Sequence, residues 1–449
     1  MQSNKKDLTQ GNIWTKLILY FLPLAAGTIF QQLYNAVDGL IVGRYVGTIA
    51  LAAVGGSAAP ISHGLVNFFV GLTSGGSVLV AQFFGANNGK ALKKAVHTSI
   101  IFTFAFGFVV SIAGYILTPN VLCWMKTPQD TMADSIVYLR IIFAGVLFQI
   151  MYNMGAAILR AVGDSKSPFI YLAISSVTNI VLDLLFVCKF EMGVAGAAYA
   201  TVISQGASCI LVFAKLASAK GENYGLRWED LKLDMTILKR MLGIGVPVGA
   251  QSLMYFAMNM LIQVGINSLG TVVVAAWAVE EKLDAFFWGL MTSVNTTITN
   301  FVGQNFGKGD YERVKKGVRA SFVLFMGLAF AFCALILATP HILVPLFDDN
   351  PEVVECAISI VYFFGPVYWI WTINEILSGA LRGEGKTRVP FIVAFISVCV
   401  FRFTWVKTVF AANPTLRCLS TCYPISWALA SLGMVIYYVI HLKHKSVVK

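Results

Sequence analysis

Polar side chains inside long apolar stretches are the residues of this chain that could do chemistry. Asp38 lies in the first apolar segment, and Asp183 lies in the fifth, where Asn179 precedes it by one helical turn and shares its face. At about 1.5 Å per residue the two carboxylates fall at similar depth, and Thr201 in the sixth segment adds a hydroxyl group. Such oxygen ligands suit Na+, and buried carboxylates also bind protons. The alternative is a structural hydrogen-bond network without ion flux.

A second group of charges lies in the eighth apolar segment. Glu280 and Asp284 are four residues apart and share a helix face, with Glu281 and Lys282 between them. These acids would attract a cationic substrate or form a second ion site. In the alternative interpretation, Lys282 and the acids neutralise one another and line a wet cavity. Glu375, in the tenth segment, is a weaker candidate.

Aromatic residues make up 13% of the chain, and some of them could line an apolar cavity for planar cations. Most aromatic side chains of a membrane protein face lipid instead. Arg402 and Lys407, in the eleventh segment, are expected to extend outward to the membrane surface. The substrate-binding candidates are Glu280, Asp284, Tyr255, Met258, Trp288, Gln31, Tyr152 and Trp371.

No catalytic motif accompanies these residues. The sequence has no P-loop, no nucleophile elbow and no HExxH motif, so we expect neither an enzyme nor direct use of ATP. The only cofactor expected is the coupling ion, H+ or Na+. The one metal considered is Na+ at Asp38, Asn179 and Asp183.

Composition places these residues in a membrane protein. Of the 449 residues, 57% are hydrophobic and only 12% are charged, whereas a soluble chain carries about 25% charged residues. Segments of about 20 apolar residues can cross a bilayer, and the chain has twelve of them. Their approximate limits are 14–41, 50–82, 95–118, 134–159, 167–188, 193–217, 238–266, 271–302, 317–340, 353–381, 389–411 and 420–441.

The net charge of +11 has a topological explanation. Most of the 33 Lys and Arg residues fall in short loops on one side of the predicted membrane, which places both termini in the cytoplasm of a multi-pass cell (inner) membrane protein. The lipid bilayer is therefore the expected partner of this surface, and nucleic acid is not.

The two halves of the chain repeat each other at an offset of about 222 residues. Val80–Gly85 returns as Val302–Gly307, and Leu159–Arg160 returns as Leu381–Arg382. Six spans separate the copies, so the symmetry axis runs along the membrane normal. We expect two six-helix bundles, residues 1–218 and 238–449, joined by a cytoplasmic linker, 219–237. The repeated loops form a gate, or they only end helices and set topology.

These motifs resemble those of the multidrug and toxic compound extrusion (MATE) family over essentially the whole chain. The resemblance rests on Pro23, Gln31–Gly43, Gly47–Ala53, the doubled Gln-x-x-Gly loops, and Leu159–Gly163 with Leu381–Lys386. It implies two six-helix bundles that expel cationic or amphipathic drugs by proton or sodium antiport. It also implies that Asp38, Asn179, Asp183 and Thr201 form the cation site of the N-terminal half.

The chain departs from the family pattern in its C-terminal half. Some members carry further carboxylates in spans seven and ten, where this chain has Tyr255 and Trp371. That difference moves the expected coupling site to the N-terminal half.

The sequence therefore predicts an all-α membrane protein of twelve transmembrane helices that exports small organic molecules by antiport. Alternatives are a flippase for lipid-linked precursors, which needs a cationic cavity for phosphate, and a dedicated exporter of one metabolite. A channel is disfavoured because no filter-like loop is present. Because the repeat already supplies two bundles, we expect a monomer.

Overall fold

The computed structural model describes residues 7–46, 59–219 and 221–447, and all regular structure in these ranges is helical. The helices are α1 (Ile13–Tyr45), α3 (Ala59–Gly85), α4 (Gly89–Trp124), α5 (Gln129–Ala161), α6 (Lys166–Asp183), α7 (Gly193–Ser218), α8 (Met235–Asn267), α9 (Thr271–Lys308), α10 (Tyr311–Ala338), α11 (Pro340–Leu343), α12 (Pro351–Phe364), α13 (Tyr368–Gly383), α14 (Arg388–Ala394), α15 (Phe401–Trp405) and α16 (Leu416–Val447). Each predicted span overlaps at least one of these helices.

Most of these helices are long and apolar enough to cross a bilayer. Within the described ranges ten spans meet that condition, and α12 with α13, bent by 51° at a short break, supplies an eleventh. The predicted span that remains is α9. It carries four charged residues within five positions, from Glu280 to Asp284, which explains its weaker apolar signal.

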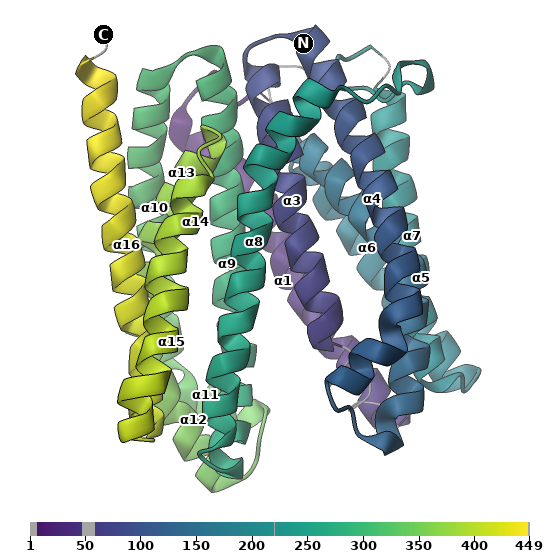
Figure 1. Cartoon of the computed structure of the whole chain (residues 1–449), viewed down its shortest axis with the longest axis vertical. Coiled ribbons are helices and arrows are strands. Elements are labelled where there is room, and N and C mark those ends of the chain that lie inside the picture. Colours follow the sequence, from purple (N-terminus) through teal and green to yellow (C-terminus); the bar gives the residue numbers. More distant parts are fainter. Residues whose placement is uncertain (1–6, 47–58, 220, 448–449) are drawn as a thin grey trace.

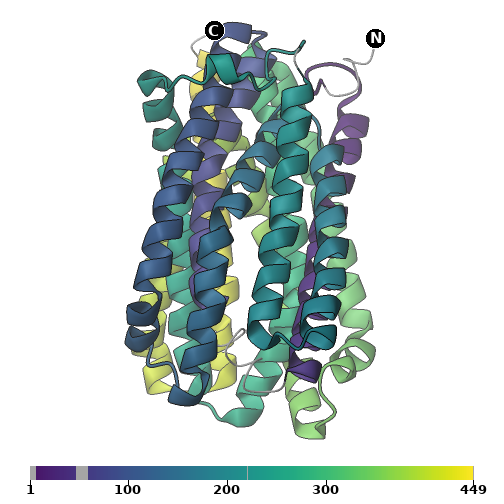
Figure 2. The ribbon, with the colours of Figure 1, turned by 90° about the vertical axis from the view of Figure 1, so that its right-hand side faces the viewer.

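The helices form two bundles, and both ends of the chain lie at the same end of the molecule (Figure 1). The N-terminal bundle contains α1 and α3–α7, and the C-terminal bundle contains α8–α16. Figure 2 shows the helices running along the long axis of the molecule. The bundles meet mainly through α3 against α8 and α9, and through α1 against α9. We call the end that holds both chain ends the terminus side; the bundles separate toward the opposite, far side (Figure 1).

Glycines allow α3 and α8 to touch backbone to backbone. A Cβ atom added to Gly71 would lie 2.6 Å from Cα of Gly249, and one added to Gly75 would lie 2.1 Å from the carbonyl oxygen of Met241. Helices in lipid approach closely through such small residues, because packing replaces the hydrophobic driving force. The glycines of the second predicted span are therefore explained by this close packing of α3 against α8.

The repeated Gln-x-x-Gly loops join the bundles at the terminus side. Gln82 donates to the carbonyl oxygen of Gly383 at 2.9 Å, and Gln304 donates to that of Ala161 at 2.8 Å. Gln82 and Gln304 are 222 positions apart, and so are Ala161 and Gly383. The internal repeat therefore relates the two hydrogen bonds. Both cross from one bundle to the other, and we call them the glutamine pair.

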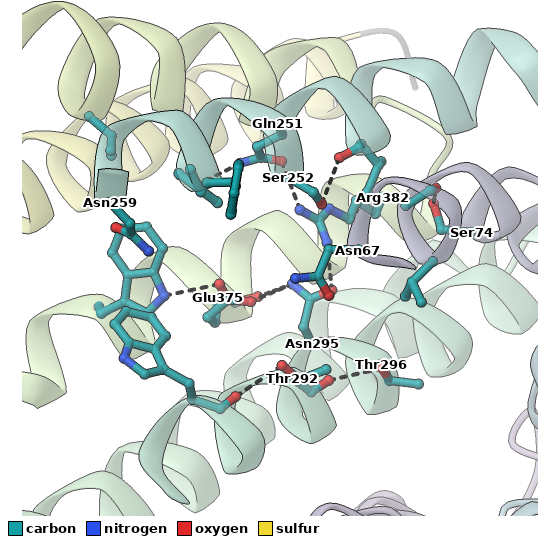
Figure 3. A pocket seen from close by; sticks show the side chains of 18 of the residues that line it. Asn67, Ser74, Gln251, Ser252, Asn259, Thr292, Asn295, Thr296, Glu375 and Arg382 are labelled. Carbon is teal, nitrogen blue, oxygen red and sulfur yellow. Dashed lines mark hydrogen bonds between the residues drawn. The ribbon is translucent and has the colours of Figure 1, made fainter. Parts of the chain in front are cut away.

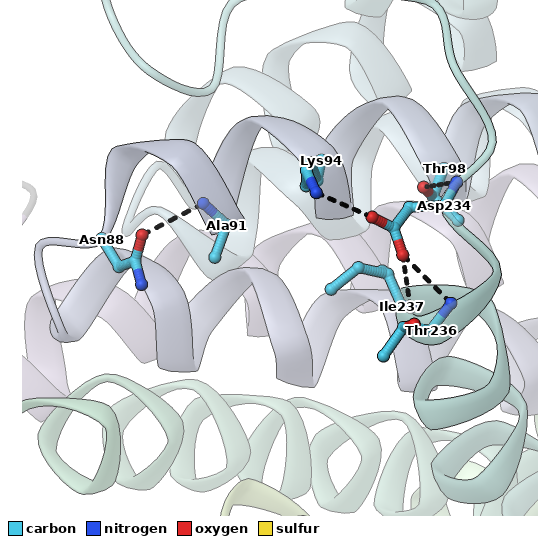
Figure 4. A network of polar contacts seen from close by, with 7 residues as sticks. All are labelled: Asn88, Ala91, Lys94, Thr98, Asp234, Thr236 and Ile237. Carbon is cyan, nitrogen blue, oxygen red and sulfur yellow. Dashed lines mark hydrogen bonds and ion pairs between the residues drawn. The ribbon is translucent and has the colours of Figure 1, made fainter.

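The start of α8 is attached to the N-terminal bundle by Asp234 (Figure 4). Its Oδ1 accepts from the backbone N–H groups of Thr236 and Ile237, which caps the helix, and its Oδ2 accepts from Lys94 Nζ at 2.9 Å. The bonds from Lys94 and Ile237 hold the pKa of Asp234 below its ordinary value. The same carboxylate thus caps α8 and ties it to α4.

Alanine at Gly85 or Gly307 is expected to push the bundles apart at the terminus side. The new Cβ atoms would lie 1.8 Å from the carbonyl oxygen of Gln304 and 1.9 Å from that of Gln82, distances that real contacts do not reach. The glutamine pair would then lengthen or break.

Spin labels at Lys90 and Glu312, exposed positions related by the repeat, would measure this separation in a cysteine-free background. We expect a longer distance by double electron–electron resonance in both alanine variants. Gly327→Ala is the control, because a Cβ there meets nothing within 4 Å. An unchanged distance in Gly85→Ala would contradict the assigned contact.

Asp234→Ala is expected to lower the melting temperature more than Asp234→Asn, because Asn keeps the helix cap and loses only the ion pair. A carboxyl group with a lowered pKa stabilises the fold above its unfolded pKa, about 3.9, and loses that effect as pH falls through its folded pKa. The difference between wild type and Asp234→Ala should therefore shrink below about pH 4. Thermal unfolding in detergent measures it, with the exposed Glu229→Ala as control; a difference that grows on acidification would be inconsistent with the ion pair.

Candidate functional site: a polar cavity between the bundles

A cavity of about 530 Å³ lies between the bundles. The N-terminal bundle contributes residues of α3 and α5 to its wall, and the C-terminal bundle contributes residues of α8, α9, α12, α13, α15 and α16. Its charged lining residues are Glu280, Glu281, Asp284, Glu375, Arg160, Arg382 and Arg402. The cavity therefore carries both signs of charge within a transmembrane region.

The acids of α9 are held by aromatic side chains of the cavity wall. Tyr368 Oη donates to Glu280 Oε1 at 2.8 Å, and Trp277 Nε1 donates to Glu281 Oε1 at 3.1 Å. Asp284 accepts from the indole nitrogen of Trp288, one turn further along the helix. All three donors are neutral, so the carboxylates keep their attraction for a cation.

Lys282 does not neutralise these acids. Its ammonium group lies over the ring of Phe347, 5.4 Å from the centroid, and it forms no ion pair with a described residue. The predicted neutralisation of the acids by Lys282 is therefore wrong, whereas the acids do line a cavity, as the same interpretation expected. Because Lys282 and Glu281 are neighbours on a helix, their side chains diverge by about 100°.

Aromatic rings line the same part of the cavity. Trp288 contacts Trp371 at 5.5 Å and Trp427 at 6.0 Å between ring centroids, and Tyr255 contacts Trp371 at 6.0 Å. Rings in such numbers can hold an organic cation by cation–π attraction, with about 0.5–2 kcal/mol for each favourable contact. The two positions at which some family members carry acids, Tyr255 and Trp371, thus form part of an aromatic wall.

Arg382 organises the polar end of the cavity (Figure 3). Its guanidinium donates to Asn295 Oδ1 at 3.1 Å and to Gln251 Oε1 at 2.8 Å. Asn295 Nδ2 in turn donates to Glu375 Oε2 at 2.8 Å, and Glu375 Oε1 also accepts from Trp371 Nε1 at 3.0 Å. A chain of hydrogen bonds therefore links the arginine to the aromatic wall through a carboxylate.

Five of the eight predicted substrate-binding residues line the cavity: Glu280, Asp284, Tyr255, Trp288 and Trp371. The other three lie elsewhere. Tyr152 donates to the carbonyl oxygen of Pro168 at 3.0 Å, within the N-terminal bundle. Gln31 is exposed on α1, and Met258 packs against the core of the C-terminal bundle.

The predicted cation site lies away from the cavity, between α6 and α7. With its amide oriented to satisfy both partners, Asn179 donates to Asp183 Oδ2 at 3.0 Å and accepts from the backbone N–H of Thr201 at 3.3 Å. Asp183 is fully buried, at 0% exposure. The backbone of Asp38 belongs to α1, which packs along α6, but its side chain lies outside the described part of the structure.

The C-terminal bundle does not repeat this site. An offset of 222 residues takes Asn179, Asp183 and Thr201 to Phe401, Trp405 and Tyr423, which carry no carboxylate or amide. The surrounding backbone does repeat, because π-helical turns follow both Asp183 (Leu184–Lys189) and Trp405 (Val406–Phe410). Such turns are frequent at functional sites. The repeat thus keeps the scaffold, and the ligand set belongs to one half only.

Three arginines of the cavity were not among the predicted binding residues. Arg160 and Arg382 lie in the repeated loops, where sequence reasoning gave basic residues a topological role. Arg402 was expected to extend outward, and that expectation is wrong. It is 4% exposed, its Nε donates to Ser426 Oγ at 3.0 Å, and its guanidinium lies 4.0 Å from the Tyr423 ring centroid. The signal that could have found them is the cost of an ionisable residue inside a span.

Two bundles related by an internal repeat, with a polar cavity between them, define a multi-pass membrane protein with the architecture of a secondary transporter. The MatE family model matches residues 23–185 and 247–405, and the chain belongs to this family, as its sequence motifs predicted.

Curated relatives carry names of drug exporters. The chain is 28% identical to the probable multidrug resistance protein YoeA of Bacillus subtilis, over 98% of this chain and 96% of that protein. It is 24% identical to the probable multidrug resistance protein NorM of Thermotoga maritima, over 86% and 83% of the two chains.

Solved structures share the fold. A MOP superfamily transporter from Pyrococcus furiosus, described as having a binding pocket of reverse polarity, superimposes with a TM-score of 0.91 at 22% identity over 97% of both chains. An outward-facing MATE transporter also gives a TM-score of 0.91, at 21% identity over 97% of both chains. At these identities the likeness concerns the fold alone.

Glu280→Gln is expected to weaken binding of a planar organic cation such as ethidium by about tenfold, because a desolvated charge pair contributes at least ~1.5 kcal/mol. Fluorescence titration of the purified chain measures it. Glu355→Gln, an exposed acid of α12, is the matched control and should bind as the wild type does. Equal affinities for all three proteins would remove Glu280 from the binding site.

Proposed function

We propose that this chain is a secondary active transporter that exports cationic or amphipathic organic compounds in exchange for protons or sodium ions. The observation that supports the proposal most directly is the cavity, where aromatic rings and unneutralised carboxylates lie together between two bundles. Such a surface attracts a flat cation by burial, by charge and by cation–π contacts. Family membership and the names of the relatives agree with this assignment.

The direction of transport follows from topology in this proposal. The excess of Lys and Arg in the loops of the terminus side supports a cytoplasmic position for that side. The bundles are in contact there through the glutamine pair and separate toward the far side, so the cavity faces outward. Rocking of one bundle on the other would break the glutamine pair and open the cytoplasmic side.

The coupling ion is assigned to the N-terminal bundle. Asp183 is buried in a span with Asn179 as its partner. Burial of an ionisable group at such a position costs free energy, which favours a functional role for it. Asp38 completes the proposed site by its place on α1, which packs along α6. Protonation or Na+ binding there would change the packing of α1 against α6 and thereby the contact of α1 with α9 in the other bundle.

The proposal is tested by accumulation of a fluorescent organic cation in cells that lack their own efflux pumps. The wild-type chain should lower accumulation, and Asp183→Asn and Asp38→Asn should abolish at least about 90% of that effect at matched expression, because an amide does not titrate. Asp349→Asn, an exposed acid, is the control. Loss of export on removal of Na+ would identify sodium, and loss on collapse of the proton gradient would identify the proton.

Two results would contradict parts of the proposal. Full export by Asp183→Asn and Asp38→Asn would place coupling elsewhere, with Glu280 the next residue to test. No export by the wild type would favour a lipid-linked precursor flippase or an exporter of one metabolite. The flippase gains support from the three arginines of the cavity, because phosphate recognition needs such groups.

A further inference from the structure

An open groove lies on the terminus side, where the start of α1 meets the start of α10. Its volume is about 680 Å³, and it is lined by residues 11–14 and by seven residues between Asp310 and Val323. The two helices belong to different bundles and contact each other here. The groove shares no lining residue with the polar cavity between the bundles, so it is a separate feature of the molecule.

The internal repeat relates this groove to the contact between α8 and α4. In that contact Asp234 caps α8 and accepts from Lys94 Nζ at 2.9 Å. The offset of 222 residues takes Asp234 to Asn12 and Lys94 to Lys316, and both of these line the groove. Asn12 also caps its helix, because its Oδ1 accepts from the backbone N–H of Trp14 at 2.9 Å. Its amide is neutral, however, so Lys316 is not given the carboxylate that its equivalent has.

A second contact of the repeat is also missing from the groove. The backbone N–H of Asp234 donates to Thr98 Oγ1 at 3.1 Å, which holds the segment before α8 against α4. The equivalent of Thr98 is Ala320, which lines the groove and has no hydroxyl group. The groove therefore lies where one copy of the repeat lacks two polar contacts that the other copy makes.

Two basic side chains of the groove have no acidic partner among the described residues. Lys316 and Arg319 lie three residues apart on one face of α10, are exposed, and form no ion pair there. Arg319 interacts electrostatically with the hydroxyl group of Tyr438. Glu384, which also acts on Tyr438, is bound to His441 at 2.8 Å. Two positive charges thus face the groove.

The acids beside the groove are engaged with other groups. Asp310 Oδ1 accepts from the backbone N–H of Arg313 at 2.9 Å, and Glu312 pairs with Lys315 at 3.4 Å. Asp310 and Asp7 are the acids that act on the Arg313 guanidinium. The segments outside the described ranges contain no Asp or Glu. An anion from outside the chain is therefore the natural counter-charge for the two exposed basic groups.

The groove continues into the apolar outer surface of both helices. Trp14 is 43% exposed and Val323 is 67% exposed, and both line the groove. Further along the same helix faces, Ile18 and Leu22 of α1 and Phe330 of α10 are exposed as well. Tryptophan is enriched where a membrane protein meets the headgroup region of the bilayer. The basic groups thus lie at the level of lipid headgroups, and the apolar surface lies at the level of acyl chains.

We propose that this groove binds an anionic phospholipid, with the phosphate at Lys316 and Arg319 and an acyl chain along Trp14 and Val323. Lys and Arg bind phosphate through charge-assisted hydrogen bonds, and basic pockets between transmembrane helices hold anionic headgroups. A lipid in this position contacts both bundles on the side where they are closed. The inference goes beyond the proposed export and does not depend on which compound is exported.

The test is native mass spectrometry of the purified full-length chain in detergent. The chain is titrated with dioleoylphosphatidylglycerol, which is anionic, or with dioleoylphosphatidylcholine, which is zwitterionic, and the dissociation constant of the first bound lipid is measured. The wild type should bind phosphatidylglycerol at least about fivefold more tightly. Lys316→Gln should weaken binding of phosphatidylglycerol by about fivefold and leave phosphatidylcholine within about twofold.

Asn12→Asp tests the missing counter-charge without removing a basic group. It should also weaken binding of phosphatidylglycerol by about fivefold, because the new carboxylate neutralises Lys316 as Asp234 neutralises Lys94. Asp and Asn cap helices equally well, so the fold is kept. Lys94→Gln is the matched control and should bind phosphatidylglycerol as the wild type does. Elution of each variant as a single monodisperse peak confirms that it is folded.

Several results would overturn the inference. One is equal affinity of the wild type for the two lipids, and another is wild-type affinity for phosphatidylglycerol in both Lys316→Gln and Asn12→Asp. Equal weakening by Lys94→Gln would show that the basic surface in general holds the lipid. Displacement of phosphatidylglycerol by inorganic phosphate would assign the groove to a soluble anion, and a dimer that Asn12→Asp abolishes would assign it to a second copy of the chain. Because lipid binding is measured directly, failure of export in cells would leave this result unchanged.

Discussion

A charged or polar group inside a bilayer must find its partners within the protein, because the hydrocarbon offers none. An acidic side chain at the centre of a span costs about 3 kcal/mol when unpartnered. In this chain the cost is met in two ways. Asp183 is buried against Asn179 between α6 and α7, and the acids of α9 and α13 face the interface of the bundles, where indole, phenol and amide groups donate to them.

The same constraint explains why the interface between the bundles is polar in its middle and close-packed at one end. At the terminus side, glycines let backbones touch, and the glutamine pair satisfies carbonyl oxygens at helix ends with donors from the opposite bundle. These two bonds lie at the terminus side of the interface. A contact of this kind suits the rocking of one bundle on the other that we propose.

Pseudo-symmetry governs the scaffold but not the chemistry. The repeat reproduces helix caps, as Asn88 and Asp310 show, as well as the glutamine pair and the π-helical turn that follows Asp183 and Trp405. The residues that we propose as ion ligands in the N-terminal bundle have no equivalents in the other half, and the acids and aromatic rings of the cavity come almost entirely from the C-terminal bundle. The two halves share their backbone geometry because it determines how the helices pack. The side chains that line the cavity contribute less to that packing, so they differ between the halves.

The sequence by itself determined the class of protein, the number of spans, the repeat and the residues that had to be explained. Hydropathy is summed along the chain, so the spans can be found without a structure. A charged residue within a span stands out at any position, and Asp183, Glu280 and Asp284 were therefore identified as candidate site residues from the sequence. The tertiary structure decided which of these groups meet. The rotation of each helix about its axis is set by packing against its neighbours, and it turned Lys282 and Tyr152 away from the cavity while it turned Arg160 and Arg402 into it.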